Sequence, residues 1–266
     1  MSDLVADLHV HTVVSDGELT LDAVPERARA AGLDAVAVTD HDRVNPDLPA
    51  PVVERDGVTL VHGIELRVET DRERMDLLGY GVERTEGLVA ELERLQRDRV
   101  ERARRIVECV ERRLGVVLDV DIAPGVGRPH IARAVDRSDA PLSYQDAFDD
   151  LIDDGGPCYV SRDVPSFERG AALLDEACAL VALAHPYRYD DPAAALSRAA
   201  DGGLDAVERY YPYGRPVDQA AADALIDDAG LLATGGSDAH DRALGRAGLD
   251  RADWRAVADR LPGTQA

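Results

Sequence analysis

Two histidines stand two residues apart in an apolar run near the N-terminus, in the segment Asp7-Leu8-His9-Val10-His11. In an extended strand alternate side chains share a face, so His9 and His11 are expected to point the same way. Two imidazoles on one buried face commonly share a divalent metal ion. A His-x-His pair also fits an ordinary strand with surface histidines, so the interpretation depends on what recurs along the chain.

Four later segments place histidines or acidic residues directly after apolar runs that are typical of strands. They are Thr39-Asp40-His41-Asp42, Gly63-Ile64-Glu65, Leu183-Ala184-His185-Pro186 and Gly236-Ser237-Asp238-Ala239-His240. With the first strand they hold five of the seven histidines. Mixed histidine and carboxylate ligands form open metal sites, where adjacent ions neutralise phosphate charge and lower the pKa of water. The segments therefore predict a metal centre suited to phosphate-ester hydrolysis.

These residues need a scaffold that brings strand ends together. From residue 166 onward, three predicted helices each precede a short apolar strand, at residues 180–184, 206–210 and 231–234. Repeated units of this kind, with polar residues at the strand ends, predict an α/β parallel barrel with its site on the C-terminal rim.

The pattern changes in the middle of the chain. A long amphipathic helix is predicted from Thr85 to Leu114, with many arginines on its outer face. We therefore expect a barrel domain, residues 1–84 and 157–266, and a small inserted helical subdomain for substrate binding, residues 85–156.

The composition is strongly acidic. The chain has 52 acidic and 30 basic residues, a formal net charge of -22, and arginine as its only basic residue besides histidine. Salt screens the self-repulsion of such a surface, so a halophilic source is expected, although a GC-biased genome would also favour arginine over lysine. No apolar run is long enough to span a bilayer and no signal pattern opens the chain, which favours a cytoplasmic protein.

The three cysteines, Cys109, Cys158 and Cys178, form no Cys-x-x-Cys motif. They fit free thiols in a reducing compartment better than a disulfide framework or a zinc ribbon.

The ordered motifs resemble the PHP (polymerase and histidinol phosphatase) domain family over nearly the whole chain. The matching segments are His-Val-His, Ser-Asp-Gly, Thr-Asp-His, Gly-Ile-Glu, Ala-His-Pro and Gly-Ser-Asp-Ala-His. The insertion, which contains Gly127-Arg128-Pro129-His130-Ile131-Ala132-Arg133, resembles the TrpH-like branch. The resemblance implies a distorted (β/α)7 barrel that holds two or three divalent ions, Mn²⁺, Zn²⁺ or Fe²⁺.

Carried over by position, the resemblance also implies the metal ligands. They are His9, His11, Glu65 and Asp238 for the first ion, Glu65 and His185 for the second, and Asp16, His41 and His240 for the third. Asp76 stands where the family often has a histidine. A carboxylate is a harder ligand and adds negative charge, so Asp76 would favour Mn²⁺ or weaken the second ion.

Other residues are candidates for catalysis or substrate binding. Asp40 is expected to orient His41 or to cap its loop. His130 fits a leaving-group acid or a phosphate contact, and equally a buried structural histidine. The candidates for substrate binding are Arg128, Arg133 and Arg162, whose guanidinium groups suit phosphate, and Tyr210. Tyr210 and its neighbours Tyr211 and Tyr213 would stack a nucleobase or pack at the rim.

The resemblance implies a metal-dependent phosphoesterase that releases phosphate from a nucleotide through a metal-activated hydroxide. Its substrate would be a 3',5'-nucleoside bisphosphate, AMP or an RNA 5' end. An acidic surface repels polyanions, which favours small nucleotides over long RNA, and neither a membrane nor a dedicated nucleic-acid-binding domain is expected. The alternatives are a histidinol-phosphate-type phosphatase, an amidohydrolase-like enzyme and a non-catalytic, metal-binding regulatory protein.

Overall fold

The computed structural model describes residues 4–264. The chain forms two compact units, Met1–Val89 with Val164–Ala266, here called the barrel unit, and Ala90–Asp163, here called the helical unit. The expected boundaries lie several residues earlier. The first turn of the long helix belongs to the barrel unit, where a Cβ atom on Gly87 would lie 3.4 Å from Leu173.

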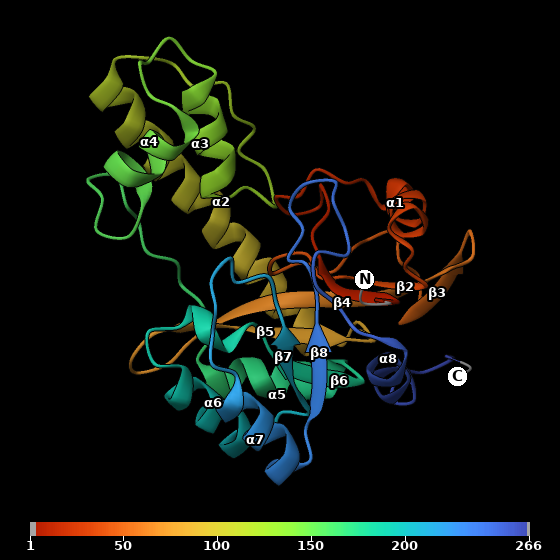
Figure 1. Cartoon of the computed structure of the whole chain (residues 1–266). Coiled ribbons are helices and arrows are strands. Elements are labelled where there is room, and N and C mark those ends of the chain that lie inside the picture. The colour runs from red at the N-terminus through yellow and green to blue at the C-terminus, as the bar shows by residue number, and fades with distance from the viewer. Residues whose placement is uncertain (1–3, 265–266) are drawn as a thin grey trace. The chain divides into compact units, whose positions relative to one another are not determined.

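One mixed sheet forms the centre of the barrel unit (Figure 1). Its order is β1 (Ala6–Val10), β2 (Ala35–Val38), β4 (Val58–Glu69), β5 (Arg74–Tyr80), β6 (Leu180–Leu183), β7 (Ala206–Tyr210) and β8 (Leu232–Gly235). Strand β3 (Val52–Arg55) pairs only with β4. A parallel bridge between Val10 and Ala239 joins β1 to the segment after β8, so the sheet is nearly closed. The predicted α/β barrel is confirmed.

Strand β5 does not follow the expected parallel pattern. It is antiparallel to both of its neighbours, β4 and β6. The turn between Glu69 and Arg74 is too short for the crossover that a parallel pair requires. The start of β5 therefore lies beside the ends of its neighbours. The carbonyl oxygen of Asp76 accepts a hydrogen bond from the backbone of Ala184, directly after β6, at 3.1 Å.

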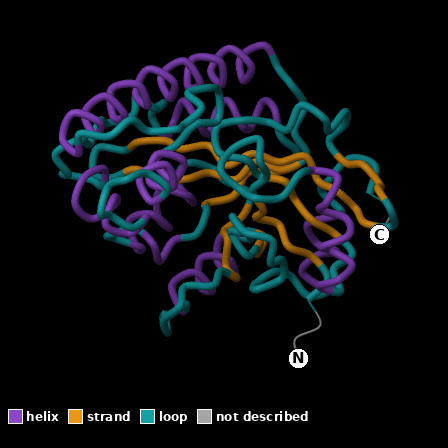
Figure 2. Tube along the Cα trace, turned by 90° about the horizontal axis from the view of Figure 1, so that it is seen from above, coloured by secondary structure: helices purple, strands orange, loops and turns teal. Residues whose placement is uncertain are grey.

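Helices surround the strands of the barrel unit (Figure 2). They are α1 (Val24–Ala31), α5 (Phe167–Ala177), α6 (Pro192–Asp201), α7 (Ala220–Ala229) and α8 (Arg251–Ala258), with 3-10 turns η1 (Leu21–Ala23) and η3 (Pro186–Arg188). Strands β1 and β2 are buried throughout, as strands covered on both faces are. Gly32 ends α1 in the left-handed conformation, at a φ of 77°.

The helical unit has its own apolar core. It contains α3 (Arg128–Asp136), α4 (Tyr144–Ala147), a π-helical turn η2 (Phe148–Ile152) and most of α2 (Glu86–Leu114). Ile106 and Val110 of α2 pack with Ile131 and Val135 of α3. In the part of the chain that the structure describes, no helix combines the length and apolar character needed to cross a membrane.

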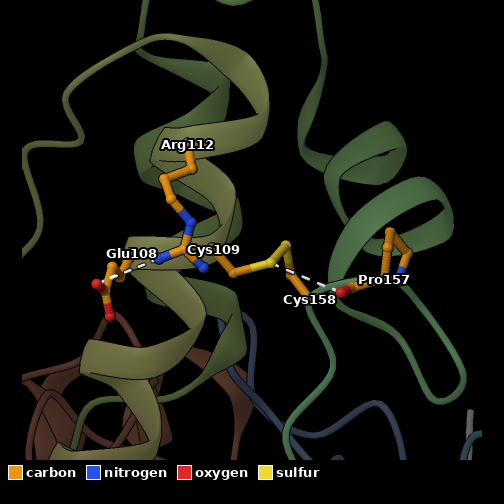
Figure 3. Close-up of a disulfide and its surroundings, with 5 residues drawn as sticks. All are labelled: Glu108, Cys109, Arg112, Pro157 and Cys158. Carbon is orange, nitrogen blue, oxygen red and sulfur yellow. Dashed lines mark hydrogen bonds and ion pairs between the residues drawn. A yellow bond between two sulfur atoms is a disulfide. The ribbon is translucent and has the colours of Figure 1, made fainter.

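The expectation of three free thiols is wrong. Cys109 of α2 and Cys158, after η2, form a disulfide with their Cα atoms 5.6 Å apart (Figure 3). The two cysteines are 49 residues apart in sequence, and the packing of α2 against the end of this unit brings them together. Only Cys178 keeps a free thiol, and burial raises its pKa to about 12. The cysteines therefore no longer argue for a reducing compartment.

Candidate metal centre

The structure gathers all nine predicted metal ligands into three groups. In each group one ligand atom per residue lies within 4.8 Å of the others. The groups are His9, His11 and Asp238; Glu65, Asp76 and His185; and His11, Asp16, His41 and His240. The strands explain this convergence, because β5 runs against its neighbours and so adds Asp76 to the rim where the other strands end.

Glu65 of β4 belongs to one group and also lies close to histidines of the other two. Its Oε1 atom is 3.1 Å from His185 Nε2 and 3.5 Å from His9 Nε2. Its Oε2 atom is 2.6 Å from His41 Nδ1 and 3.5 Å from His11 Nε2. Burial alone would raise the pKa of Glu65, but His41 and His9 outweigh burial and hold the pKa well below its usual range. This buried carboxylate is therefore charged and reaches every group.

The surroundings of His9 fit a bound cation. Its Nδ1 atom lies 2.9 Å from Glu208 Oε1, and because a carboxylate only accepts hydrogen bonds, Nδ1 carries the proton. The Nε2 atom is buried and, among residues 4–264, has no hydrogen-bond partner. Glu65 Oε1 and Asp238 Oδ1 each lie 3.5 Å from it. A histidine nitrogen beside two carboxylate oxygens suits a divalent metal ion.

Glu208 and Asp7 are buried acidic residues to which sequence analysis gives no role. Glu208 orients His9, as described above. Asp7, on β1, accepts hydrogen bonds from the backbone and the hydroxyl of Ser237 at 2.9 and 2.5 Å and from the backbone of Gly245 at 2.8 Å. It thereby fixes the segment that carries Asp238. The available signal was a single acidic residue inside each apolar strand.

Arg188, which sequence analysis missed, meets Tyr211 at Asp238. The Oδ1 atom of Asp238 is 3.0 Å from His11 Nε2. Its Oδ2 atom accepts hydrogen bonds from the Tyr211 hydroxyl at 2.8 Å and from Arg188 Nη1 at 3.2 Å. Asp238 has a φ of 50°, a conformation uncommon outside glycine, so the backbone is specialised here. An arginine thus lies beside a predicted metal ligand.

Asp40 holds the loop that follows β1. Its carboxylate accepts hydrogen bonds from the Thr12 backbone and hydroxyl and from the Ser15 hydroxyl, all at 2.7 Å. Of the two roles expected for Asp40, these contacts correspond to capping the loop. This loop carries Asp16, which directly follows Ser15. The Oδ1 atom of Asp16 lies 3.4 Å from His240 Nε2 and 3.9 Å from His41 Nε2.

Asp76 is paired with an arginine. The Arg67 guanidinium donates from Nε to Oδ1 at 2.6 Å and from Nη2 to Oδ2 at 2.5 Å. The same Oδ2 atom lies 3.7 Å from His185 Nε2. Asp76 therefore belongs to a ligand group and to an ion pair at once.

Tyr210 does not join these groups. Its hydroxyl donates to Asp253 at 2.7 Å and its ring packs against the barrel core, so the structure favours the packing alternative. The neighbouring Tyr211 faces Asp238 instead.

The remaining predicted residues lie in the helical unit. Arg128 donates to Asp153 and Asp154 at 3.1 and 2.9 Å. His130 Nδ1 accepts a hydrogen bond from the Gly127 backbone at 3.1 Å, at the start of α3. Arg133 and Arg162 are partly buried.

Comparisons with known proteins support this description. The PHP domain matches residues 7–221. The 3',5'-nucleoside bisphosphate phosphatase of Chromobacterium violaceum is 29% identical over 92% of this chain and 89% of its own. The phosphoribosyl 1,2-cyclic phosphate 1,2-diphosphodiesterase of Eggerthella lenta is 31% identical over 89% and 94% of the two chains. The Escherichia coli 5'-3' exoribonuclease Rnm is 29% identical over 89% and 85%.

A solved structure shows the same fold. The crystal structure of a protein from Bifidobacterium adolescentis superposes with a TM-score of 0.82 and 24% identity, over 97% of this chain and 96% of that one. The segment matched by the PHP domain, residues 7–221, contains His9, His11, Glu65, Asp76 and His185. The chain therefore belongs to the PHP domain family.

Proposed function

We propose that this protein is a metal-dependent phosphoesterase that removes phosphate from small nucleotides, with a 3',5'-nucleoside bisphosphate as its main substrate. The position of Glu65 carries this proposal. One buried carboxylate lies within 3.5 Å of nitrogen atoms of four histidines, which is the arrangement expected of a ligand shared between metal ions.

The nine grouped residues would hold the ions. His9, His11 and Asp238 would hold one, Glu65 and His185 with Asp76 a second, and Asp16, His41 and His240 a third. Bound divalent ions neutralise phosphate charge and lower the pKa of water, which gives a nucleophile at neutral pH. The five imidazoles and four carboxylates of these residues suit Mn²⁺, Zn²⁺ or Fe²⁺.

Arg188 is proposed to bind the phosphate group. Its side chain is 54% exposed, and its Nη1 atom donates both to the Tyr211 hydroxyl at 3.0 Å and to Asp238 Oδ2 at 3.2 Å. A guanidinium carries further N–H groups in the same plane, which suit the oxygens of a phosphate. Asp238 and Tyr211 hold the guanidinium in place, so it is oriented before substrate binds.

The choice of substrate rests on charge and on the relatives. A net charge of -22 disfavours long polyanions, and one relative is a 3',5'-nucleoside bisphosphate phosphatase. We further propose that the helical unit contributes substrate contacts through Arg128, His130, Arg133 and Arg162. The exoribonuclease relative supports a second candidate substrate, the 5' end of RNA.

The test is phosphate release by the full chain with added Mn²⁺ in high salt. The substrates would be 3',5'-bisphosphoadenosine, AMP, histidinol phosphate and a short 5'-phosphorylated RNA. We expect the highest kcat/KM with the bisphosphate, and loss of turnover in Glu65→Ala and Asp238→Ala variants that keep the wild-type circular dichroism spectrum. Release from histidinol phosphate alone would contradict the proposed substrate, and full activity in either variant would contradict the proposed centre.

A further inference from the structure

Arg67 and Asp76 are direct neighbours across the β4–β5 pair. Both oxygens of Asp76 accept hydrogen bonds from the Arg67 guanidinium, at 2.6 and 2.5 Å. The Asp76 side chain is 4% exposed and that of Arg67 is 32% exposed. This is a bidentate ion pair whose acidic partner is shielded from water.

The same ion pair lies at one of the candidate metal sites. Asp76 Oδ2 is 3.7 Å from His185 Nε2, which is itself 3.1 Å from Glu65 Oε1. Glu65 and Arg67 are two residues apart on β4, so their side chains share a face of the strand. The Arg67 guanidinium therefore pairs with Asp76 and lies on the same face of the sheet as Glu65.

The charges of the pair cancel. A histidine at the position of Asp76 would be a neutral ligand and would need no partner, whereas Asp76 adds one negative charge and Arg67 adds one positive charge. A divalent ion at this group would have to share the Asp76 oxygens with the guanidinium, and it would be repelled by a like charge only a few ångströms away. Arginine cannot relieve this conflict by losing its proton, because its pKa is too high.

We propose that Arg67 is a resident cation that keeps the affinity of the Glu65–Asp76–His185 group for its divalent ion low. The inference rests on the metal binding of the proposed function, and it goes further by assigning a residue that sets the occupancy of one group. That group would fill and empty with the free metal concentration. The His9–His11–Asp238 group would keep its ion, because its arginine contact is a single 3.2 Å hydrogen bond from the exposed Arg188 to Asp238 Oδ2, and Oδ1 stays with His11.

The experiment is a calorimetric titration of the metal-free full chain with Mn²⁺. The wild type should show a weak binding step, and Arg67→Met should tighten that step by about tenfold or more, a change of about 1.4 kcal/mol. Arg67→Lys keeps the charge and should stay near the wild-type affinity. Arg198→Met is the matched control, because Arg198 pairs with Asp71 and Glu168 outside the three groups.

Two results would overturn the proposal. An unchanged weak step in Arg67→Met would show that the guanidinium does not compete with the ion. A weaker step would show that Arg67 instead positions Asp76 as a ligand. Because no turnover is measured, a protein that binds Mn²⁺ but hydrolyses none of the nucleotides would still test this inference separately from the proposed function.

A second comparison covers the case in which Arg67→Met does not fold, since that variant leaves a buried carboxylate unpaired. Asp76→Asn leaves the positive charge uncompensated and should weaken the step. The double variant Arg67→Met/Asp76→Asn removes both charges and should bind about tenfold more tightly than Asp76→Asn alone. Equal affinities of these two variants would also overturn the proposal.

Discussion

Glu208 on β7 holds His9 on β1 by a 2.9 Å contact between its Oε1 atom and the imidazole Nδ1, across 199 residues of sequence. Both side chains are fully buried. The contact fixes the tautomer of His9 and aims Nε2 at Glu65 and Asp238. A residue outside the three ligand groups thus determines how a predicted ligand is oriented.

Replacing Glu208 should therefore weaken metal binding without removing a ligand. We expect Glu208→Gln to lower the Mn²⁺ affinity of the tightest site by about 10- to 100-fold. The reason is that a neutral amide at this position makes the His9 imidazole less basic than a carboxylate does. Calorimetry on the metal-free chain measures this. Glu168→Gln, an exposed acidic residue paired with Arg198, is the control and should bind as the wild type does. Wild-type affinity in Glu208→Gln would show that His9 needs no such partner.

Arg188 should affect substrate more than metal. We expect Arg188→Met to raise KM for 3',5'-bisphosphoadenosine by about tenfold or more, because a hydrogen bond to a charged group contributes about 1.5–3 kcal/mol. Steady-state kinetics with saturating Mn²⁺ measures KM and kcat separately. Arg260→Met removes another exposed arginine, paired with Asp205, and should leave KM unchanged. A loss of Mn²⁺ affinity with unchanged KM would assign Arg188 to the support of Asp238 instead.

Most of the predicted ligands could be found from sequence because they lie in an apolar strand or just after one. His9 in β1, His185 after β6 and Asp238 after β8 are examples, and the parallel strands carry them to one rim. Asp76 is instructive, since only the antiparallel direction of β5 places the start of that strand at the same rim. The resemblance supplied its position, and the hairpin explains it.

The partners of these ligands could not be found in the same way. Glu208 contacts His9, and Arg67 contacts Asp76, only because of strand register and the closure of the barrel. The disulfide is a similar case, since the spacing of Cys109 and Cys158 carries no information about packing. The sequence offered Tyr210 and Tyr211 alike, and it could not tell which of them packs and which contacts Asp238, because neighbouring residues of a strand end face opposite ways.

His62 should make the stability of the protein depend on pH. Burial, with the charge of Arg84, lowers the pKa of His62 from 6.5 to about 4. As the pH falls, His62 therefore takes up a proton at a higher pH in the unfolded chain than in the folded chain. The resulting stabilisation is complete above pH 6.5 and is lost as the pH falls towards 4, at about 1.4 kcal/mol per pH unit.

The measurement is urea unfolding of the metal-free wild type and His62→Leu at several pH values. The other titrating groups contribute to both proteins, so they cancel in the difference. We expect the wild type to lose about 3 kcal/mol relative to His62→Leu between pH 6.5 and pH 4. A constant difference across this window would show that His62 titrates alike in both states.

The disulfide between Cys109 and Cys158 should stabilise the helical unit. A cross-link that closes a loop of this length contributes about 2–4 kcal/mol by restricting the unfolded chain. We expect Cys109→Ser/Cys158→Ser to lower the unfolding temperature and to leave Mn²⁺ affinity unchanged, because the nine grouped residues lie in the barrel unit. Cys178→Ser, which removes the free thiol, is the control for the loss of sulfur. An unfolding temperature equal to the wild type would contradict this role.

Salt should stabilise the whole chain, because 52 acidic residues face 30 arginines. Salt shortens the range over which like charges on the surface repel one another. The Debye length falls from about 10 Å at 0.1 M to about 3 Å at 1 M. We therefore expect the unfolding temperature to rise steadily between 0.1 and 1 M KCl. Sucrose, which stabilises folded proteins without screening charge, separates the two effects. If sucrose raises the unfolding temperature and KCl does not, self-repulsion contributes little to the stability of this acidic protein.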